Sequence, residues 1–172
     1  RETAVWAAGV DHVVWNPERK VPSDTLEKVM VYVKGQGKTI LPATLETLKN
    51  NEKEIKTLYC GTHTPSDYKK LLEWSDFVVC LGGSETQGLA LAQAWSMNRQ
   101  TLVFESDEVR QRRQNAAPYI TEHTGRKWNN IDELCECLTT LKNISPRNWV
   151  LANQTNEIAF GRFLDIVNGL YV

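Results

Sequence analysis

The sequence predicts an α/β domain whose core is a Rossmann-like parallel sheet with helices on both faces. Short apolar runs rich in β-branched residues alternate four times with segments of helical apolar spacing, within about eighty residues. This alternation is typical of parallel strands joined by right-handed helical crossovers. Glycine also follows three of the four runs, which suits tight turns at the ends of strands.

The two patterns place the elements along the chain. Strands are predicted at 28–34, 55–60, 77–81 and 100–104. Helices are predicted at 39–50, 66–76, 89–97, 131–142 and 146–167. Ser66 is the candidate N-cap of the second helix, and Pro146 suits the first turn of the last one. The polar stretch 105–130 is expected to contain one turn, at 117–119.

With 172 residues, of which 41% are hydrophobic, the chain can fill one core but is too short for two full domains. We expect a single domain over 1–172, with a lead-in at 1–22, an α/β core at 28–130 and C-terminal helices at 131–172. The chain begins with Arg1 rather than methionine, so we interpret it as a piece of a longer protein.

Charge and cysteine usage exclude several classes of partner. Twenty basic residues oppose twenty-one acidic ones, so the chain has no general attraction for nucleic acid. No apolar run approaches the ~18 residues of a membrane span, and Arg1-Glu2-Thr3 does not begin a signal peptide. The four cysteines do not form a disulfide pattern, which favours a reducing, cytoplasmic compartment. Because the three histidines are scattered, no metal site is expected.

Ligands of open parallel sheets bind beyond the carboxyl ends of the strands, so the loops at that edge are the candidate site. Three of these loops contain glycine: 34–37, 61–64 and 82–85. Together they predict a concave polar rim on one edge of the sheet. In the third loop, Gly82 and Gly83 would let the backbone approach a ligand closely, and Ser84 could cap the next helical segment.

The helix expected after the third loop has the features of a phosphate site. Its first amides, at Gly88, Leu89 and Ala90, have no partner within the helix, and the helix dipole favours an anion there. Glu85, just upstream, could accept hydrogen bonds from hydroxyl groups, and Gln93 lies one turn beyond Leu89 on the same face. An acid for a sugar, amides for a diphosphate and an amide side chain for a ribose together indicate a nucleotide-sugar.

The stretch 85–95 (ETQGLALAQAW) resembles the signature of the large retaining glycosyltransferase family with the GT-B fold, which is related to glycogen and sucrose synthases. Members have a Glu, seven residues and a second Glu, with Gly-x-x-x-x-Glu-Ala inside. The segment 6–17 (WAAGVDHVVWNP) is similar to the Gly-Val-Asp…Pro segment that opens their C-terminal domain. The resemblance also covers 75–79 (SDFVV) and 124–125, and so spans nearly the whole chain.

The resemblance implies roles for the residues that would meet the sugar and the diphosphate. Glu85 would be the catalytic residue that faces the hydroxyls of the donor sugar. The backbone of 88–90 would hold the distal phosphate. Lys34, with Lys38 in reserve, would pair with the diphosphate, because the family places a basic residue after its first strand.

The nucleoside end of the site departs from the family pattern. Gln93 stands where members have a Glu that binds the ribose, which replaces a charge-assisted hydrogen bond by a neutral one about half as strong. One strand–helix unit of the family is also missing before the signature. The loop at Gly61, Thr62 and His63 is therefore our candidate for contact with the base or a phosphate.

We expect the donor-binding domain of a glycosyltransferase that moves a sugar from a nucleotide-diphosphate sugar to an acceptor hydroxyl. Retention of anomeric configuration is what the resemblance implies. No cofactor beyond the donor is expected, since the chain has no Asp-x-Asp metal motif. The expected partner is an N-terminal, acceptor-binding domain of the same polypeptide, without which the chain should be inactive. The resemblance leaves membrane association of the whole enzyme open.

Two other functions are weighed against this one. A degenerate module could bind nucleotide-sugar, or hold a partner, without catalysis, and the glutamine at Gln93 is compatible with that. A Rossmann-type nicotinamide domain is disfavoured, because its Gly-x-Gly-x-x-Gly must follow the first strand and 35–37 (GQG) is followed by Lys38-Thr39-Ile40. The basic run 110–113 is interpreted as an exposed helix face rather than a phosphate or lipid patch.

Overall fold

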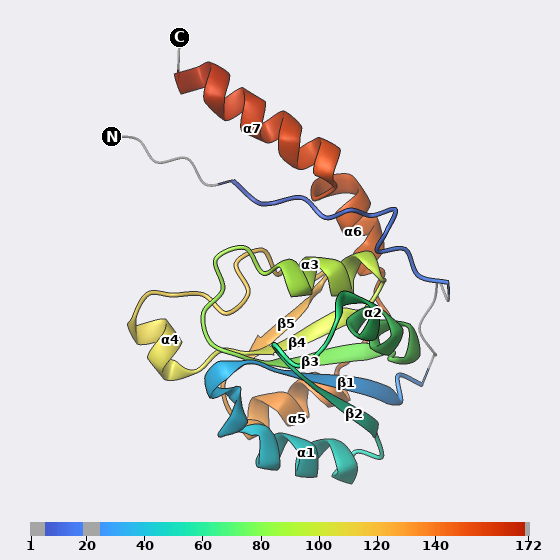
Figure 1. The fold of residues 1–172 in the computed structure, drawn as a ribbon. Helices are drawn as coiled ribbons and strands as arrows, with labels where there is room; N and C mark the ends of the chain where they lie inside the picture. Colours follow the sequence, from blue (N-terminus) through green and yellow to red (C-terminus); the bar gives the residue numbers. More distant parts are fainter. Residues whose placement is uncertain (1–5, 19–24, 171–172) are drawn as a thin grey trace.

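The computed structural model describes residues 6–18 and 25–170 and confirms the α/β fold with a Rossmann-like parallel sheet. The strands are β1 (Lys28–Val33), β2 (Glu54–Tyr59), β3 (Phe77–Leu81), β4 (Gln100–Phe104) and β5 (Gly125–Trp128). They run parallel in the order β2-β1-β3-β4-β5, with helices over both faces (Figure 1). Residues 1–5 and 19–22 of the expected lead-in, and 171–172 of the expected C-terminal helices, lie outside the described residues.

Four strands occupy the apolar runs that predict them, and β5 does not. The prediction of a single turn over 105–130 is wrong, because this stretch contains β5 and a short helix, α4 (Asp107–Gln111). β5 reads Gly-Arg-Lys-Trp and has no apolar run, since it is an edge strand with a partner on one side only. Its register against β4 runs from Thr101↔Gly125 to Phe104↔Trp128.

The remaining helices are α1 (Leu41–Asn50), α2 (Pro65–Trp74), α3 (Leu89–Ser96), α5 (Ile131–Thr139), α6 (Pro146–Asn153) and α7 (Asn156–Leu170), with a 3-10 turn, η1, at Gly35–Lys38. Ser66 is not the cap of α2. Thr64 is, since its hydroxyl accepts from the Asp67 amide while the Asp67 carboxylate accepts from the Thr64 amide. A single helix over 146–167 is also wrong, because α6 ends and α7 begins at a break after Asn153.

Alternate residues of the strands fill two cores, one on each face of the sheet. Met30, Val78 and Cys80 pack in a cluster with residues of α2 and α3. Val29 and Val79 pack in a second cluster with residues of α1 and α5. Because the inner strands are buried on both faces, their sequences are continuously apolar instead of alternating. Both faces are thereby occupied by helices, and the edges of the sheet remain for ligands.

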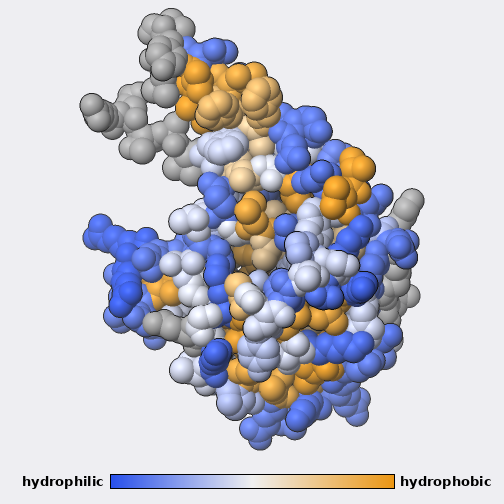
Figure 2. All heavy atoms as spheres, in the orientation of Figure 1, coloured by the Kyte–Doolittle hydropathy of each residue, from blue (hydrophilic) through white to orange (hydrophobic). Residues whose placement is uncertain are grey.

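The lead-in runs along the last two helices. Val10 donates its amide to the Gln154 carbonyl at 2.9 Å, and the Trp6 indole donates to the Ala159 carbonyl at 2.6 Å. The helix α7 projects away from the sheet beside the N-terminal segment (Figure 1). Apolar side chains gather along it (Figure 2), and Phe160 and Phe163 are both exposed.

In the described part of the chain, no helix has the length and apolar character needed to cross a membrane. All four cysteines are free thiols. Cys80 and Cys137 are buried, whereas Cys60 is exposed just beyond the end of β2.

Candidate functional site

The carboxyl ends of β1 and β3 bring Lys34 and Glu85 together, although 51 positions separate them in the sequence. The two strands are paired up to Val33↔Leu81, and the Lys34 amide continues the ladder by donating to the Leu81 carbonyl at 2.7 Å. The Lys34 ammonium then donates to Glu85 Oε1 at 2.6 Å. The lysine side chain is 42% exposed and the glutamate side chain 23% exposed, so a ligand in solvent can reach both.

The loop that carries Glu85 is fixed from behind by a polar network. The Glu85 amide donates to the Asn115 carbonyl at 2.8 Å. The Lys127 ammonium donates both to the Asn115 side chain, at 2.7 Å, and to Glu105 Oε1, at 2.8 Å. Glu105 also accepts from the Ala116 amide at 3.1 Å. This network ties the ends of β4 and β5 to the backbone of Glu85.

Glu105 is held in its charged form by this network. Burial raises the pKa of its carboxyl group, but the hydrogen bonds from Lys127 and Ala116 and the nearby Arg110 outweigh burial and lower the pKa overall. The carboxylate therefore keeps its hydrogen-bond acceptors at neutral pH, which orders the segment that supports Glu85.

The amino end of α3 lies beside this ion pair and is open. Gly88, the N-cap, has a left-handed backbone with φ of 61°, a conformation that glycine adopts without strain. The Ala92 amide donates to the Gly88 carbonyl at 3.0 Å and so begins the helical ladder. Among the described residues, no group accepts from the amides of Leu89, Ala90 or Leu91. Leu89 is 51% exposed, whereas Leu91 is buried, so the helix start is open to solvent at Leu89.

Three adjoining hollows share the Lys34 side chain. The first, of about 230 Å³, is lined by Tyr32, Lys34 and the loop 85–90. The second, of about 340 Å³, lies on the other side of Lys34, against Ser84 and Arg112. The third is a narrow space of about 20 Å³ behind Gly82 and Gly83. We call the three together the rim hollows.

The predicted residues divide into two groups. Those that line the rim hollows come from the first and third loops and the start of α3: Lys34, Gly82, Gly83, Ser84, Glu85, Gly88, Leu89 and Ala90. Gln93 is half-buried one turn along α3 and lines none of the three hollows. Lys38 lies in η1 and does not line them either.

The loop 61–63 reaches the rim through one aromatic contact. Gly61 and Thr62 are exposed, whereas His63 is half-buried and stacks on Tyr68 with ring centroids 5.7 Å apart. His63 Nε2 lies 3.4 Å from the Tyr32 hydroxyl, and Tyr32 lines two of the rim hollows. The histidine therefore approaches the site behind Tyr32 instead of lining it.

Tyr32 is a site residue that sequence reasoning missed, although its position contains a signal. It precedes Lys34 by two positions on a strand, so the two side chains lie on the same face of the sheet. Burial, followed by a hydrogen bond with Cys60 and nearby charges that include Glu85, raises the pKa of Tyr32. The phenol therefore stays protonated and presents a neutral hydroxyl to the rim.

Gln87 was also missed, and Arg112 was assigned only to an exposed helix face. The Gln87 side chain accepts from the Ala8 amide at 2.8 Å and donates to the Trp6 carbonyl at 3.1 Å, so it ties the lead-in to the start of α3. Arg112 lines the hollow that contains Lys34 and Ser84, and its guanidinium lies 2.6 Å from Glu108. The role of Gln87 has no local signature, because it depends on contacts with a segment far away in the sequence.

A comparison with protein-family models and with curated proteins found no match. In the described part of the chain, no three His, Cys, Asp or Glu side chains are grouped so that they could hold a metal ion. The interpretation of the site therefore rests on its residues and their geometry.

Proposed function

We propose that this chain is the donor-binding domain of a glycosyltransferase, which moves a sugar from a nucleotide-diphosphate sugar to an acceptor hydroxyl with retention of configuration. One observation carries the proposal. A lysine, an acid and the open amino end of a helix meet at the carboxyl edge of a parallel sheet, around Lys34 and Glu85. This is the edge at which such sheets bind their ligands.

The diphosphate would lie between the Lys34 ammonium and the amides of Leu89 and Ala90. Open amides at a helix start bind anions through hydrogen bonds and the helix dipole. The ammonium adds a charge-assisted contact, and it can stabilise the negative charge that develops on the leaving diphosphate. Without a donor, Glu85 satisfies this ammonium, so donor binding exchanges one anionic partner for another.

Glu85 would contact the sugar. Its Oε1 holds Lys34, and its second carboxylate oxygen is available at the rim, since the residue lines two of the rim hollows. A carboxylate accepts two or more hydrogen bonds, which suits the neighbouring hydroxyls of a hexose. The Glu85 backbone is fixed through Asn115, so the carboxylate position does not depend on Lys34 alone.

The nucleoside would extend toward Tyr32 and His63. The Tyr32 hydroxyl can donate to a ribose or a base, and His63 is stacked behind it. Gln93 remains the candidate for the ribose by its position on α3. Because Gln93 does not line the rim hollows, a ribose would have to extend beyond them to reach it. Its hydrogen bond to a ribose hydroxyl would be neutral.

The acceptor-binding domain would cover the apolar side of α7. Phe160, Phe163 and Leu164 recur at helical spacing and are 60%, 41% and 42% exposed. The Trp6 ring lies 5.5 Å from that of Phe163, so the lead-in and α7 present one apolar surface. A contiguous exposed apolar patch of this kind marks an interaction surface.

Calorimetric titration of the chain with UDP-sugars, GDP-sugars and the two nucleoside diphosphates tests the proposal. Lys34→Gln should weaken both classes of ligand about tenfold, because both contain the diphosphate. Glu85→Ala should weaken only the nucleotide-sugars, by about tenfold, and bring their affinity down to that of the diphosphates. Lys38→Gln is the matched control and should change neither.

Two results would count against the proposal. If Glu85→Ala leaves nucleotide-sugar binding unchanged, Glu85 does not contact the sugar. The degenerate binding or scaffolding module then becomes the better description. If Lys34→Gln and Lys38→Gln weaken binding equally, the effect is a general one of charge and the diphosphate site is elsewhere.

A further inference from the structure

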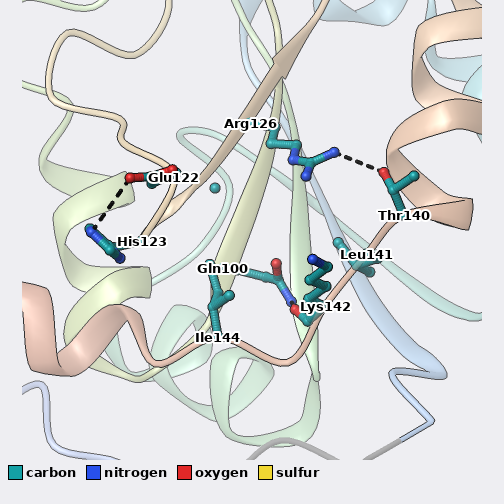
Figure 3. A pocket seen from close by; sticks show the side chains of 9 residues that line it. Gln100, Glu122, His123, Arg126, Thr140, Leu141, Lys142 and Ile144 are labelled. Carbon is teal, nitrogen blue, oxygen red and sulfur yellow. Dashed lines mark hydrogen bonds and ion pairs between the residues drawn. The ribbon is translucent and has the colours of Figure 1, made fainter.

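A second hollow lies at the opposite, amino edge of the sheet, across the molecule from the rim hollows. We call it the amino-edge hollow. It has a volume of about 240 Å³ and lies where β4 and β5 begin, at Gln100 and Gly125 (Figure 3). The segment after α5, at 140–144, forms its other wall. No residue of the amino-edge hollow lines the rim hollows.

Two cations line this hollow without an acidic partner. Arg126, on β5, donates to the Thr140 hydroxyl at 2.8 Å, and that hydroxyl donates to the Glu136 carbonyl at 2.7 Å, which orients the guanidinium. Lys142 lines the wall beyond α5. Within 6–18 and 25–170, no carboxylate lies within 4.0 Å of either cation. The guanidinium has further N–H groups that can donate to a ligand.

One acidic side chain also lines the hollow. Glu122 lies beside its neighbour His123, with 3.8 Å between the carboxylate and Nε2 (Figure 3). Both side chains are strongly exposed, at 89% and 68%. Arg126 and Lys142 are exposed as well, so the lining has two cations against one acid, all open to solvent.

Gln100 adds an acceptor on a largely buried side chain that points into the same space. The residue is only 5% exposed, and its Nε2 donates to the Lys142 carbonyl at 2.7 Å. Since a carbonyl accepts only, this bond fixes the amide orientation and leaves Oε1 toward the hollow (Figure 3). No described group donates to Oε1. This oxygen is not among the described buried polar atoms that lack a partner, so it is open to the hollow, and a ligand hydroxyl could donate to it.

We propose that the amino-edge hollow binds a phosphate group that also offers a hydroxyl, as hydrogen phosphate or as the phosphate monoester of a small polyol, which keeps a free hydroxyl. Arg126 and Lys142 would hold the phosphate oxygens through charge-assisted bonds, with the arginine able to bind two oxygens at once. The ligand hydroxyl would donate to Gln100 Oε1. This second site is separate from the proposed donor site, so both ligands can be bound at the same time.

The test is a titration of the isotope-labelled chain with inorganic phosphate, glycerol phosphate or sulfate at constant ionic strength, followed by amide NMR shifts. Phosphate should shift the amides of Gly125, Arg126 and Leu141. Sulfate has no proton to donate at neutral pH, so its affinity should be about tenfold lower. Arg126→Gln and Lys142→Gln should each weaken phosphate binding about tenfold.

Controls separate this site from general charge and from the proposed donor site. Lys49→Gln, on α1, and Lys34→Gln should leave the shifts at the amino edge unchanged. Tighter binding of glycerol phosphate than of inorganic phosphate identifies an ester as the ligand, and the reverse order identifies free phosphate; either supports the proposal. Equal binding of sulfate and phosphate, or equal loss with Lys49→Gln and Lys142→Gln, overturns it. The titration needs no nucleotide, so its failure leaves the donor proposal standing.

Discussion

The two edges of the sheet differ in how their charges are compensated. At the carboxyl edge, Lys34 is already paired with Glu85, and open backbone amides lie beside the pair. At the amino edge, Arg126 and Lys142 have no carboxylate within ion-pair distance among the described residues, and the Gln100 amide oxygen faces the same hollow. A ligand at the carboxyl edge must exchange partners, whereas a ligand at the amino edge supplies a missing negative charge. The first arrangement favours selectivity, and the second favours any anion of suitable size and hydrogen bonding.

Each edge contains a glycine that packs against the backbone of a neighbouring strand. Substituting these two glycines tests whether both edges depend on that close contact. A Cβ at Gly37 would lie 2.2 Å from the Leu81 carbonyl oxygen, and one at Gly125 would lie 2.0 Å from that of Thr101. Backbone cannot yield as a flexible side chain can, so each alanine substitution should lower the free energy of unfolding by about 3 kcal/mol or more. Urea unfolding followed by circular dichroism measures this.

Gly83→Ala is the matched control for those two variants. A Cβ there meets nothing within 4 Å, and the glycine does not have a left-handed φ. The change should therefore alter stability by no more than about 0.5 kcal/mol. If Gly37→Ala is as mild as Gly83→Ala, the close contact between η1 and the end of β3 is not what fixes Lys34 at the rim.

Acid should affect the carboxyl edge through Glu105, since its network supports the Glu85 loop. The folded state lowers the pKa of Glu105, so the stabilisation is complete above the ordinary glutamate pKa of about 4.3 and is lost as the pH falls through the folded value. Replacing it by Gln should cost about 1–3 kcal/mol at pH 7, because the bonds from Lys127 and Ala116 would then reach a neutral amide instead of a carboxylate. The difference in unfolding free energy between wild type and variant should shrink as the pH falls from about 5 toward 3.

Glu108→Gln is the control for this pH dependence. Glu108 is 48% exposed and pairs with Arg112 at the surface, so its loss should change stability by less than about 1 kcal/mol. Amide shifts of Glu85 and Asn115 should follow the titration of Glu105. Should those shifts stay constant while the variant loses stability, the network would be structural only and would not position the Glu85 loop.

The sequence predicted the interior of the sheet well, and the reason is physical. The inner strands are buried on both faces, so Val29 to Val33 and the run FVVCL are unmistakably apolar. β5 could not be predicted in the same way, because Arg126 and Lys127 occupy two of its four positions. Neither charge packs in the core. Arg126 lines the amino-edge hollow, and Lys127 donates to Glu105 and Asn115, which support the carboxyl edge.

The candidate site could be predicted in two kinds of place: where its residues are neighbours in the sequence, and where they follow strands that end at the same edge of the sheet. The loop 82–90 has a recognisable pattern, and Lys34 follows from the rule that parallel strands share a carboxyl edge. Tyr32 can be predicted as a site residue only when each side chain of the strand is assigned to one face of the sheet. Asn115 and Gln87 depend on tertiary contacts with segments that no spacing rule connects to them. The proposed ribose role of Gln93 stays a prediction.

The smallest expected effect concerns the Lys34–Glu85 pair itself, and it sharpens the comparison most. A double-mutant cycle with Lys34→Gln and Glu85→Gln should give a coupling of about 0.2–1 kcal/mol in urea unfolding, because partly exposed ion pairs contribute little. The coupling should approach zero in about 1 M salt, where charges are screened within a few ångströms. A pair this weak leaves Lys34 available to a diphosphate, so partner exchange at this edge would be easy. Coupling well above that range, or unaffected by salt, would mean that the pair is a fixed structural element and that Lys34 does not transfer to a ligand.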